Sequence, residues 1–204
     1  MSEAFRVAMT FDAEHPDRPS CPPGVAERIL DTLATERVRA TFFVQSRWAM
    51  SQPALARRIG DEGHLVGNHS TFHARMTLLT DEGIHTDVRE ADDTIRQLTG
   101  ADPRPWFRCP FGEGRDDPRV LGALEGLGYR NVHWDVEPFD WEPTTTAEEV
   151  TRRTVDASVA RGDGAVVLLH TWSEPAAGGL PGTLARLADA GAAFVTIDQL
   201  EELP

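Results

Sequence analysis

Short apolar segments alternate with helical patterns along the whole chain, and this alternation constrains the fold more than any other feature. Seven segments are predicted to be strands, because short apolar runs are typical of strands buried on both faces. They are Phe5–Phe11, Ala40–Val44, Leu65–Gly67, Trp106–Phe107, Asn131–Trp134, Ala165–Leu169 and Phe194–Ile197.

Between these segments, apolar residues recur every three or four positions, which is the spacing of one helix face. Five such patterns predict helices. They comprise Val25, Ile29 and Leu33; Ile84, Val88, Ala91, Ile95 and Leu98, followed by Gly100; Val120, Leu124 and Leu127, followed by Gly128; Val155 and Val159; and Leu180, Leu184 and Leu187, ending near Gly191.

The repeated strand–helix order predicts an α/β fold with parallel strands. The chain has 204 residues, whereas a complete eight-unit barrel usually needs roughly 250. We therefore expect a compact or incomplete barrel, forming a single catalytic domain over residues 1–204.

The charge balance narrows the classes of partner. The chain has 33 acidic and 20 basic side chains, for a net charge of −13. Such a surface repels phosphate backbones and anionic lipids, so we expect no nucleic-acid partner and no membrane surface. The two cysteines, Cys21 and Cys109, form no CxxC pair or disulfide framework. The N-terminus lacks a basic region followed by an apolar run, so we expect a cytoplasmic chain, with a removed leader as the alternative.

Polar side chains cluster directly after five of the predicted strands. Because the C-terminal ends of parallel strands share one face, and that face carries the active site in such folds, five loops are expected to converge. The residues are Asp12 and Glu14; Asn68, His69 and His73; Arg108; Asp135, Glu137 and Asp140; and His170.

Two of these histidines have the spacing of metal ligands. His69 and His73 are four residues apart, so on one helical turn their rings would face the same way, as a divalent metal requires. A carboxylate from Asp12 or Glu14 would complete three protein ligands and leave one position open, as in catalytic metal sites. Two surface histidines in a polar loop are the alternative.

The other polar residues each have a structural and a chemical interpretation. Asp12 is either a turn carboxylate or a general base, and Arg108 is either a structural ion pair or the group that keeps Asp12 ionised. His170 is either a core histidine or a general acid. The aromatic residues Phe111, Trp134 and Trp141 are either core residues or faces that stack on sugar rings.

Five segments in this order resemble the motifs of the polysaccharide deacetylase family, also called the NodB homology domain or carbohydrate esterase family 4. The likeness extends from Thr10 to about Leu200. Thr10–Glu14 stands in the place of TFDDG, His69–His73 matches H-[ST]-x-x-H, Arg108–Gly112 matches R-x-P-[YF]-G, Glu137–Trp141 resembles D-x-x-D-W, and Leu168–His170 matches L-x-H.

The resemblance implies a distorted (β/α)7-like barrel of the NodB homology type. It implies metal-dependent removal of acetyl groups from the nitrogen, or from an oxygen, of a sugar. Asp12 would be the base, His69 and His73 would bind the metal, and Arg108 would orient Asp12. His170 would protonate the leaving group while a carboxylate of the fourth motif tunes it.

The resemblance also implies three substrate contacts. The backbone N–H of Phe111 would hold the oxyanion. Leu168 would line the pocket for the acetyl methyl group, and Trp141 would form one wall of the groove.

Two positions depart from the family pattern. The family's metal-binding second Asp is Ala13 here, and our hypothesis is that Glu14 replaces it, because the longer side chain can reach the metal from one residue further on. Asp12 is the alternative ligand. Glu137 stands in place of the first Asp of the fourth motif and is expected to serve in its role, with Asp135 as the alternative.

These features together predict a hydrolase of carbohydrate or small acetamido substrates with one divalent metal ion. Zinc is expected, and cobalt or nickel would also suit these ligands. A cytoplasmic hydrolase of small amides or cyclic imides, some of which work without metal, is the second hypothesis. A catalytically dead sugar-binding barrel is the third. The sequence indicates no particular oligomeric state.

Overall fold

The computed structural model describes residues 4–15 and 22–201. Cys21 and the first three residues of the N-terminus lie outside these ranges. Contacts divide the chain into two units, one made of residues 1–11, 16–41 and 134–204, and the other of residues 12–15 and 42–133.

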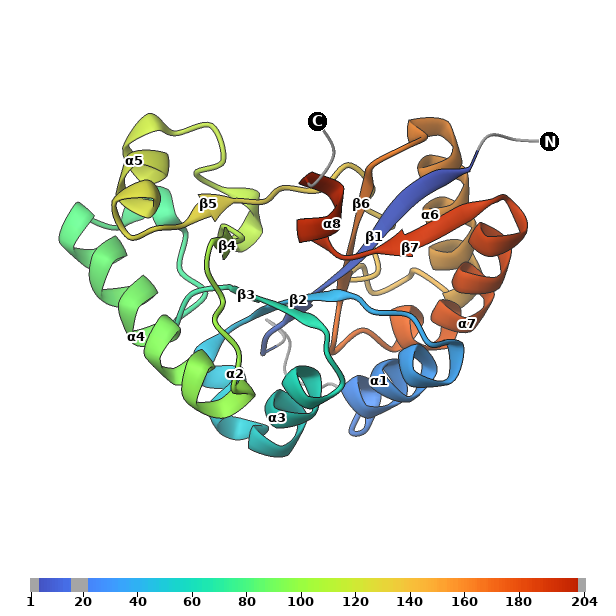
Figure 1. Ribbon diagram of the computed structural model, residues 1–204, viewed down its shortest axis with the longest axis horizontal. Helices are drawn as coiled ribbons and strands as arrows, with labels where there is room; N and C mark the ends of the chain where they lie inside the picture. Colours follow the sequence, from blue (N-terminus) through green and yellow to red (C-terminus); the bar gives the residue numbers. More distant parts are fainter. Residues whose placement is uncertain (1–3, 16–21, 202–204) are drawn as a thin grey trace. The chain divides into compact units, whose positions relative to one another are not determined.

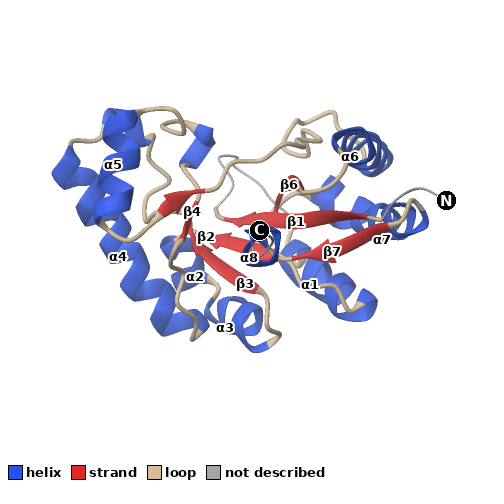
Figure 2. Cartoon of the chain, turned by 45° about the horizontal axis from the view of Figure 1, so that its top comes forward, coloured by secondary structure: helices blue, strands red, loops and turns tan. Residues whose placement is uncertain are grey.

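The first unit places helices on the outside of its strands (Figure 2). Its strand order is β6–β1–β7, and β1 and β7 pair in parallel. Figure 1 shows α6 and α7 side by side in this unit. Its elements are the larger part of β1 (Phe5–Ala13), α1 (Val25–Glu36), α6 (Ala147–Arg161), β6 (Ala165–His170), α7 (Glu174–Asp189), β7 (Ala192–Val195) and α8 (Ile197–Glu201).

The second unit has the strand order β2–β3–β4–β5, with parallel β3–β4 and β4–β5 pairs. It begins with the end of β1, so the residues that follow this strand belong to it. Its other elements are β2 (Thr41–Val44, of which Phe42–Val44 belong here), α2 (Ser46–Ser51), α3 (Pro53–Asp61), β3 (Leu65–Asn68), the 3₁₀ turn Met76–Leu78, α4 (Asp81–Thr99), β4 (Trp106–Phe107), the 3₁₀ turn Pro110–Gly112, α5 (Pro118–Gly126) and β5 (Arg130–Asn131).

Helix α4 begins and ends where its sequence predicts. The Thr80 side chain accepts a hydrogen bond from the backbone N–H of Gly83, which satisfies one of the unpaired donors of the first turn. Gly100 ends the helix in the left-handed conformation at φ 77°, which glycine adopts at no steric cost. The apolar side chains Ile84 and Val88 then pack into a buried cluster with Phe107.

Every predicted strand is present, and β5 and β7 differ most from their predicted ranges, while β1 ends at Ala13 rather than Phe11. Strand β5 covers Arg130–Asn131 rather than Asn131–Trp134, and only Val136 pairs further on, in an isolated bridge to Val167. Strand β7 ends at Val195, because Thr196 caps the following helix α8 through hydrogen bonds to the side chains of Asp198 and Gln199.

The predicted buried face of α6 is wrong. Val159, which the spacing placed in the core, is 49% exposed. The buried face carries Val150, Thr151, Thr154 and Ser158, and the Thr151 hydroxyl donates to the backbone carbonyl of Gly179 in α7. Small polar residues therefore form this helix–helix contact.

Two further expectations concern the cysteines and the membrane. Cys109 is buried, and burial raises the pKa of its thiol to about 12, which agrees with its interpretation as a small apolar filler. Among the described residues, no helix combines the length and the apolar character needed to cross a bilayer.

The close packing of α3 on α4 predicts a specific stability effect. A Cβ atom added at Gly60 would lie 2.0 Å from the backbone oxygen of Thr99, whereas one added at Gly122 of α5 would meet nothing within 4 Å. Gly60→Ala should lower the free energy of unfolding by about 1–3 kcal/mol. Gly122→Ala, the control, should raise it by up to about 1 kcal/mol. Urea unfolding measures both, and equal effects would contradict the predicted contact.

Candidate active site

The end of β1 delivers two carboxylates to one imidazole. Asp12 and Glu14 are both buried, and they are separated by Ala13, which is fully buried. Successive side chains of a strand point to opposite faces, so residues two apart share a face. The Nε2 atom of His69 lies 3.5 Å from Asp12 Oδ2 and 3.2 Å from Glu14 Oε2. The spacing of the two acids thus brings both to the same ring.

The two histidines converge without a helix, contrary to the sequence prediction. Residues 69–75 contain no helical turn, and both Ser70 (φ 67°) and His73 (φ 54°) have left-handed backbone. The side chain of Asn68 accepts the N–H of Ser70, and the Ser70 hydroxyl accepts the N–H of His73. Because side chains take these donors, the segment turns as a loop. The two rings nevertheless lie 5.0 Å apart, centre to centre.

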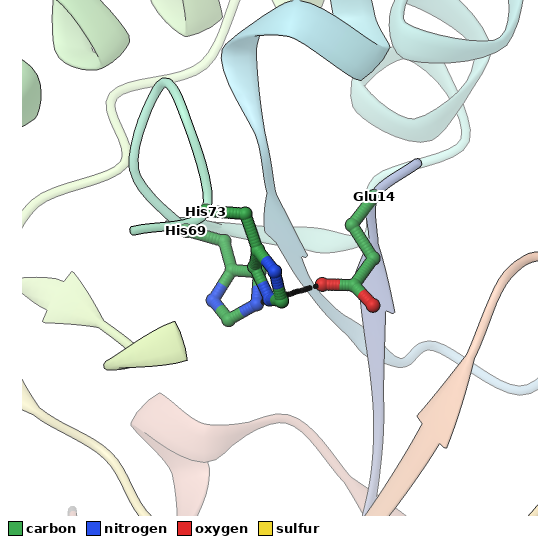
Figure 3. Close-up of side chains that lie close together, drawn as sticks. All are labelled: Glu14, His69 and His73. Atoms are coloured by element: carbon green, nitrogen blue, oxygen red, sulfur yellow. Dashed lines mark hydrogen bonds and ion pairs between the residues drawn. The ribbon is translucent and has the colours of Figure 1, made fainter. Parts of the chain in front are cut away.

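Glu14, His69 and His73 form a candidate metal centre. Glu14 Oε2 lies 2.6 Å from His73 Nε2, and one ligand atom from each of the three residues lies within 4.8 Å of the others. Figure 3 shows the Glu14 carboxylate facing both rings. All three residues are buried or nearly so, which is the enclosure expected of a ligand set.

The hydrogen bonding of His69 tests whether these residues fit a metal. His69 Nδ1 lies 2.8 Å from the backbone carbonyl oxygen of Arg108, which can only accept, so Nδ1 carries a proton. Nε2, which faces the carboxylates, then either donates a second proton to them or, in the neutral ring, offers its lone pair to a bound cation. Burial disfavours the charged ring, yet Asp12 and Glu14 raise the pKa of His69. The donor set therefore fits a divalent metal.

Asp12 is paired with Arg108, as the sequence led us to expect. Arg108 is fully buried, and its guanidinium donates to Asp12 Oδ1 at 2.8 Å. It also donates to the backbone oxygen of Val132 and lies 4.0 Å from the ring centre of Phe43. Burial lowers the pKa of Arg108 and Asp12 opposes that shift, but a guanidinium stays protonated in proteins. The hydrogen bond from Arg108 to Oδ1 holds the Asp12 carboxylate in place.

The first unit contains an acid–base pair at the end of β6. His170 Nδ1 lies 2.8 Å from Asp140 Oδ1, and the backbone N–H of His170 donates to Asp140 Oδ2 at 2.9 Å. Asp140 is almost fully buried, and the Ser173 hydroxyl donates to its backbone oxygen. The carboxylate fixes both the tautomer and the orientation of the imidazole.

The structure identifies which acid of the fourth motif contacts His170. Asp140 has that position. Glu137 instead accepts hydrogen bonds from the indole N–H groups of Trp134 and Trp141, at 3.3 and 2.9 Å. The alternative acid, Asp135, accepts from the N–H of Val166 and pairs with Arg161. Asp140, rather than Glu137 or Asp135, therefore contacts His170 in the position expected of the carboxylate that tunes it. A separate catalytic role for Glu137 stays a prediction.

The predicted substrate-binding residues differ in exposure. Phe111 is 44% exposed and lies 4.4 Å from the His73 ring, centre to centre, while the Arg75 guanidinium lies over its other side. In the first unit, Trp141 is 39% exposed, Trp134 is half-buried and Leu168 is buried. The exposed aromatic faces are available for stacking, and the substrate contacts themselves stay predictions.

Sequence reasoning missed Asp87, which binds the loop of the metal centre from α4. Its carboxylate accepts the backbone N–H groups of Thr71 and Phe72. A signal was present, because Asp87 interrupts the apolar face formed by Ile84 and Val88. A carboxylate on the buried side of a helix requires buried hydrogen-bond donors.

Comparison with known proteins places this geometry in a family. The family model described as polysaccharide deacetylase matches residues 2–132. The chain belongs to the polysaccharide deacetylase family. A relative in that family is the peptidoglycan-N-acetylmuramic acid deacetylase PdaA of Bacillus subtilis, which is 31% identical over 195 residues, covering 95% of this chain and 70% of PdaA. The expected family and its class, a deacetylating hydrolase, are confirmed.

Solved structures confirm the deacetylase fold. A structure described as T48 deacetylase with substrate has a TM-score of 0.82 and 32% identity, covering 97% of this chain and 90% of that one. BA3943, a family 4 pseudoenzyme from Bacillus anthracis, has a TM-score of 0.85 and 25% identity, covering 98% of this chain and 66% of that one. The expected (β/α)7-like fold class is thus confirmed. Because a deacetylase and a pseudoenzyme share this fold, activity depends on the residues of the site.

The geometry predicts which carboxylate holds the metal. Glu14→Gln removes the charge beside both imidazoles and should abolish binding of one equivalent of zinc. Asp12→Asn should retain it, because the Asp12 carboxylate is engaged by Arg108. Elemental mass spectrometry of the purified proteins measures the content, and circular dichroism checks that both variants are folded. Retained zinc in Glu14→Gln with lost zinc in Asp12→Asn would identify Asp12 as the ligand.

Proposed function

We propose that this chain is a metal-dependent deacetylase that releases acetate from an N-acetylated amino sugar within a carbohydrate. We further propose that residues 1–204 act as one catalytic domain. The observation that carries the proposal is the convergence of Glu14, His69 and His73, in which the Nε2 atoms of the two imidazoles lie 3.2 and 2.6 Å from Glu14 Oε2. The metal-free amide or imide hydrolase gains no support from this arrangement.

Glu14, His69 and His73 would hold the metal, and two imidazoles with one carboxylate are a ligand set of catalytic zinc sites. Zinc is the proposed ion, with cobalt or nickel as substitutes that suit the same donors. When bound, the ion would supply Lewis acidity toward the acetyl carbonyl group. The exposed Phe111 ring beside His73 supports a sugar ring as the neighbouring group.

Asp12 would act as the general base that accepts a proton from the attacking water. Arg108 donates a hydrogen bond to Oδ1 of Asp12, while Oδ2 faces His69. A carboxylate held in this way presents one oxygen in a fixed direction, which is what proton transfer requires. The backbone N–H of Phe111 would stabilise negative charge on the acetyl oxygen.

His170 would act as the general acid that protonates the leaving amine. Asp140 contacts Nδ1 and stabilises the protonated ring. This arrangement leaves the ring's second nitrogen, Nε2, as the atom that passes the proton. Because a pseudoenzyme shares the fold, acid function must be tested in this chain itself.

The test of the proposal is acetate release by the zinc-loaded protein. The substrates are chitooligosaccharides, fragments of peptidoglycan and acetylated xylan, so that N-acetyl and O-acetyl groups are compared. We expect release from an N-acetylated sugar and its loss on chelation. Zinc binding without acetate release from any of the three would favour the sugar-binding barrel.

Replacement of the general acid predicts a selective loss of activity. His170→Ala should lower kcat by at least about 100-fold, the lower range for general acid–base catalysis, with unchanged zinc content. His85→Ala, on the half-buried surface of α4, is the matched control and should leave kcat within about twofold. Wild-type activity in His170→Ala would remove the acid role while leaving the metal centre in place.

A further inference from the structure

The loop His69–His73 has two bends that its own sequence does not favour. Ser70 and His73 both have left-handed backbone, at φ 67° and 54°. Such conformations persist in non-glycine residues only when the surroundings hold them. Thr71 and Phe72 lie between the two bends, so the conformation of their backbone determines the position of His73 relative to His69.

The side chain of Asp87 holds this middle segment. One carboxylate oxygen accepts the N–H of Thr71 at 2.8 Å, and the other accepts the N–H of Phe72 at 3.2 Å. The Thr71 hydroxyl donates in return to the backbone oxygen of Asp87 at 2.9 Å. Three hydrogen bonds thus connect one residue of α4 to two adjacent residues of the loop.

The burial of Asp87 indicates that the role of its carboxylate is to bind the backbone of the loop. Asp87 is only 5% exposed and lies on the helix face that otherwise packs apolar side chains such as Ile84 and Val88. A buried carboxylate is costly unless its oxygens are hydrogen-bonded. Among the described residues, the hydrogen bonds of this carboxylate go to the loop backbone.

We infer that Asp87 is a positioning residue of the metal centre. Its two oxygens fix the loop so that the rings of His69 and His73 meet the Glu14 carboxylate. The inference rests on the proposed function, since it assigns Asp87 to the metal site proposed above. Asp87 acts through the hydrogen bonds that its carboxylate accepts from the loop backbone.

The test compares metal binding in variants at this position. Asp87→Asn keeps the size of the side chain but replaces one accepting oxygen by an NH₂ group, which faces a backbone N–H. The Kd for Zn²⁺ is measured by competition with a chelator, and the ligand geometry is followed by the visible absorption spectrum of bound Co²⁺. Asp87→Asn should weaken Zn²⁺ binding by about 10–100-fold, the range for residues that orient metal ligands, and should alter the Co²⁺ spectrum.

Two control variants separate positioning from general damage. Val88→Ala removes buried apolar atoms from the same helix without touching the loop carboxylate contact, and Asp93→Asn removes an exposed charge from it. Both should retain the wild-type Kd and spectrum. If Asp87→Asn does not fold, Asp87→Glu replaces it, because its oxygens are displaced by one methylene and should likewise weaken binding.

Each outcome bears on a different claim. Wild-type Kd and spectrum in the folded Asp87 variant, or an equal loss in Val88→Ala, would overturn the positioning role and leave the proposed function intact. Absence of metal binding in the wild type would overturn the proposed function and this inference with it. Weakened binding with an altered Co²⁺ spectrum in the Asp87 variant alone would support the positioning role.

Discussion

Burial of charge is the constraint on which the second unit depends. Asp12, Glu14, His69 and Arg108 are all withdrawn from water, and taking an ion out of water is costly unless partners compensate it. The compensation comes from three separate strand ends, because Asp12 lies at the end of β1 and Glu14 directly after it, the imidazole follows β3 and the guanidinium follows β4. The core of the unit must therefore align these strands before the charges can be accommodated.

Much of this arrangement could be predicted from local pattern. Short apolar runs identified all seven strands, and the order of polar residues after them identified the family. The same residues supplied a candidate ligand set, whose role stays a prediction. Helices α2 and α8 were missed because they have six and five residues, too few to establish a period. Helix α3 was also missed, although Leu55 and Ile59 on its buried face have helical spacing. The buried face of α6 was assigned wrongly because the sequence prediction relied on Val155 and Val159. The face that packs against α7 instead carries Thr151, Thr154 and Ser158.

The rest depended on contacts between residues distant in sequence. His69 and His73 do lie together in the candidate metal centre, but the helix assumed from their four-residue spacing is wrong, because the side chains of Asn68 and Ser70 take the backbone donors. No local pattern distinguishes Glu137 from Asp140, since both are acids of one motif. Folding brings the indole N–H groups that donate to Glu137 and the imidazole that contacts Asp140 to their places.

Arg108 connects these strand ends through both of its chemical parts. Its guanidinium donates to Asp12 at the end of β1, while its backbone oxygen accepts from the His69 ring after β3. A thermal displacement at the end of β4 would therefore move a carboxylate and an imidazole together, in the same direction. Because Arg108 is bonded to both groups, motion of a single strand changes the distance between the Asp12 carboxylate and the His69 imidazole less than it would without this residue.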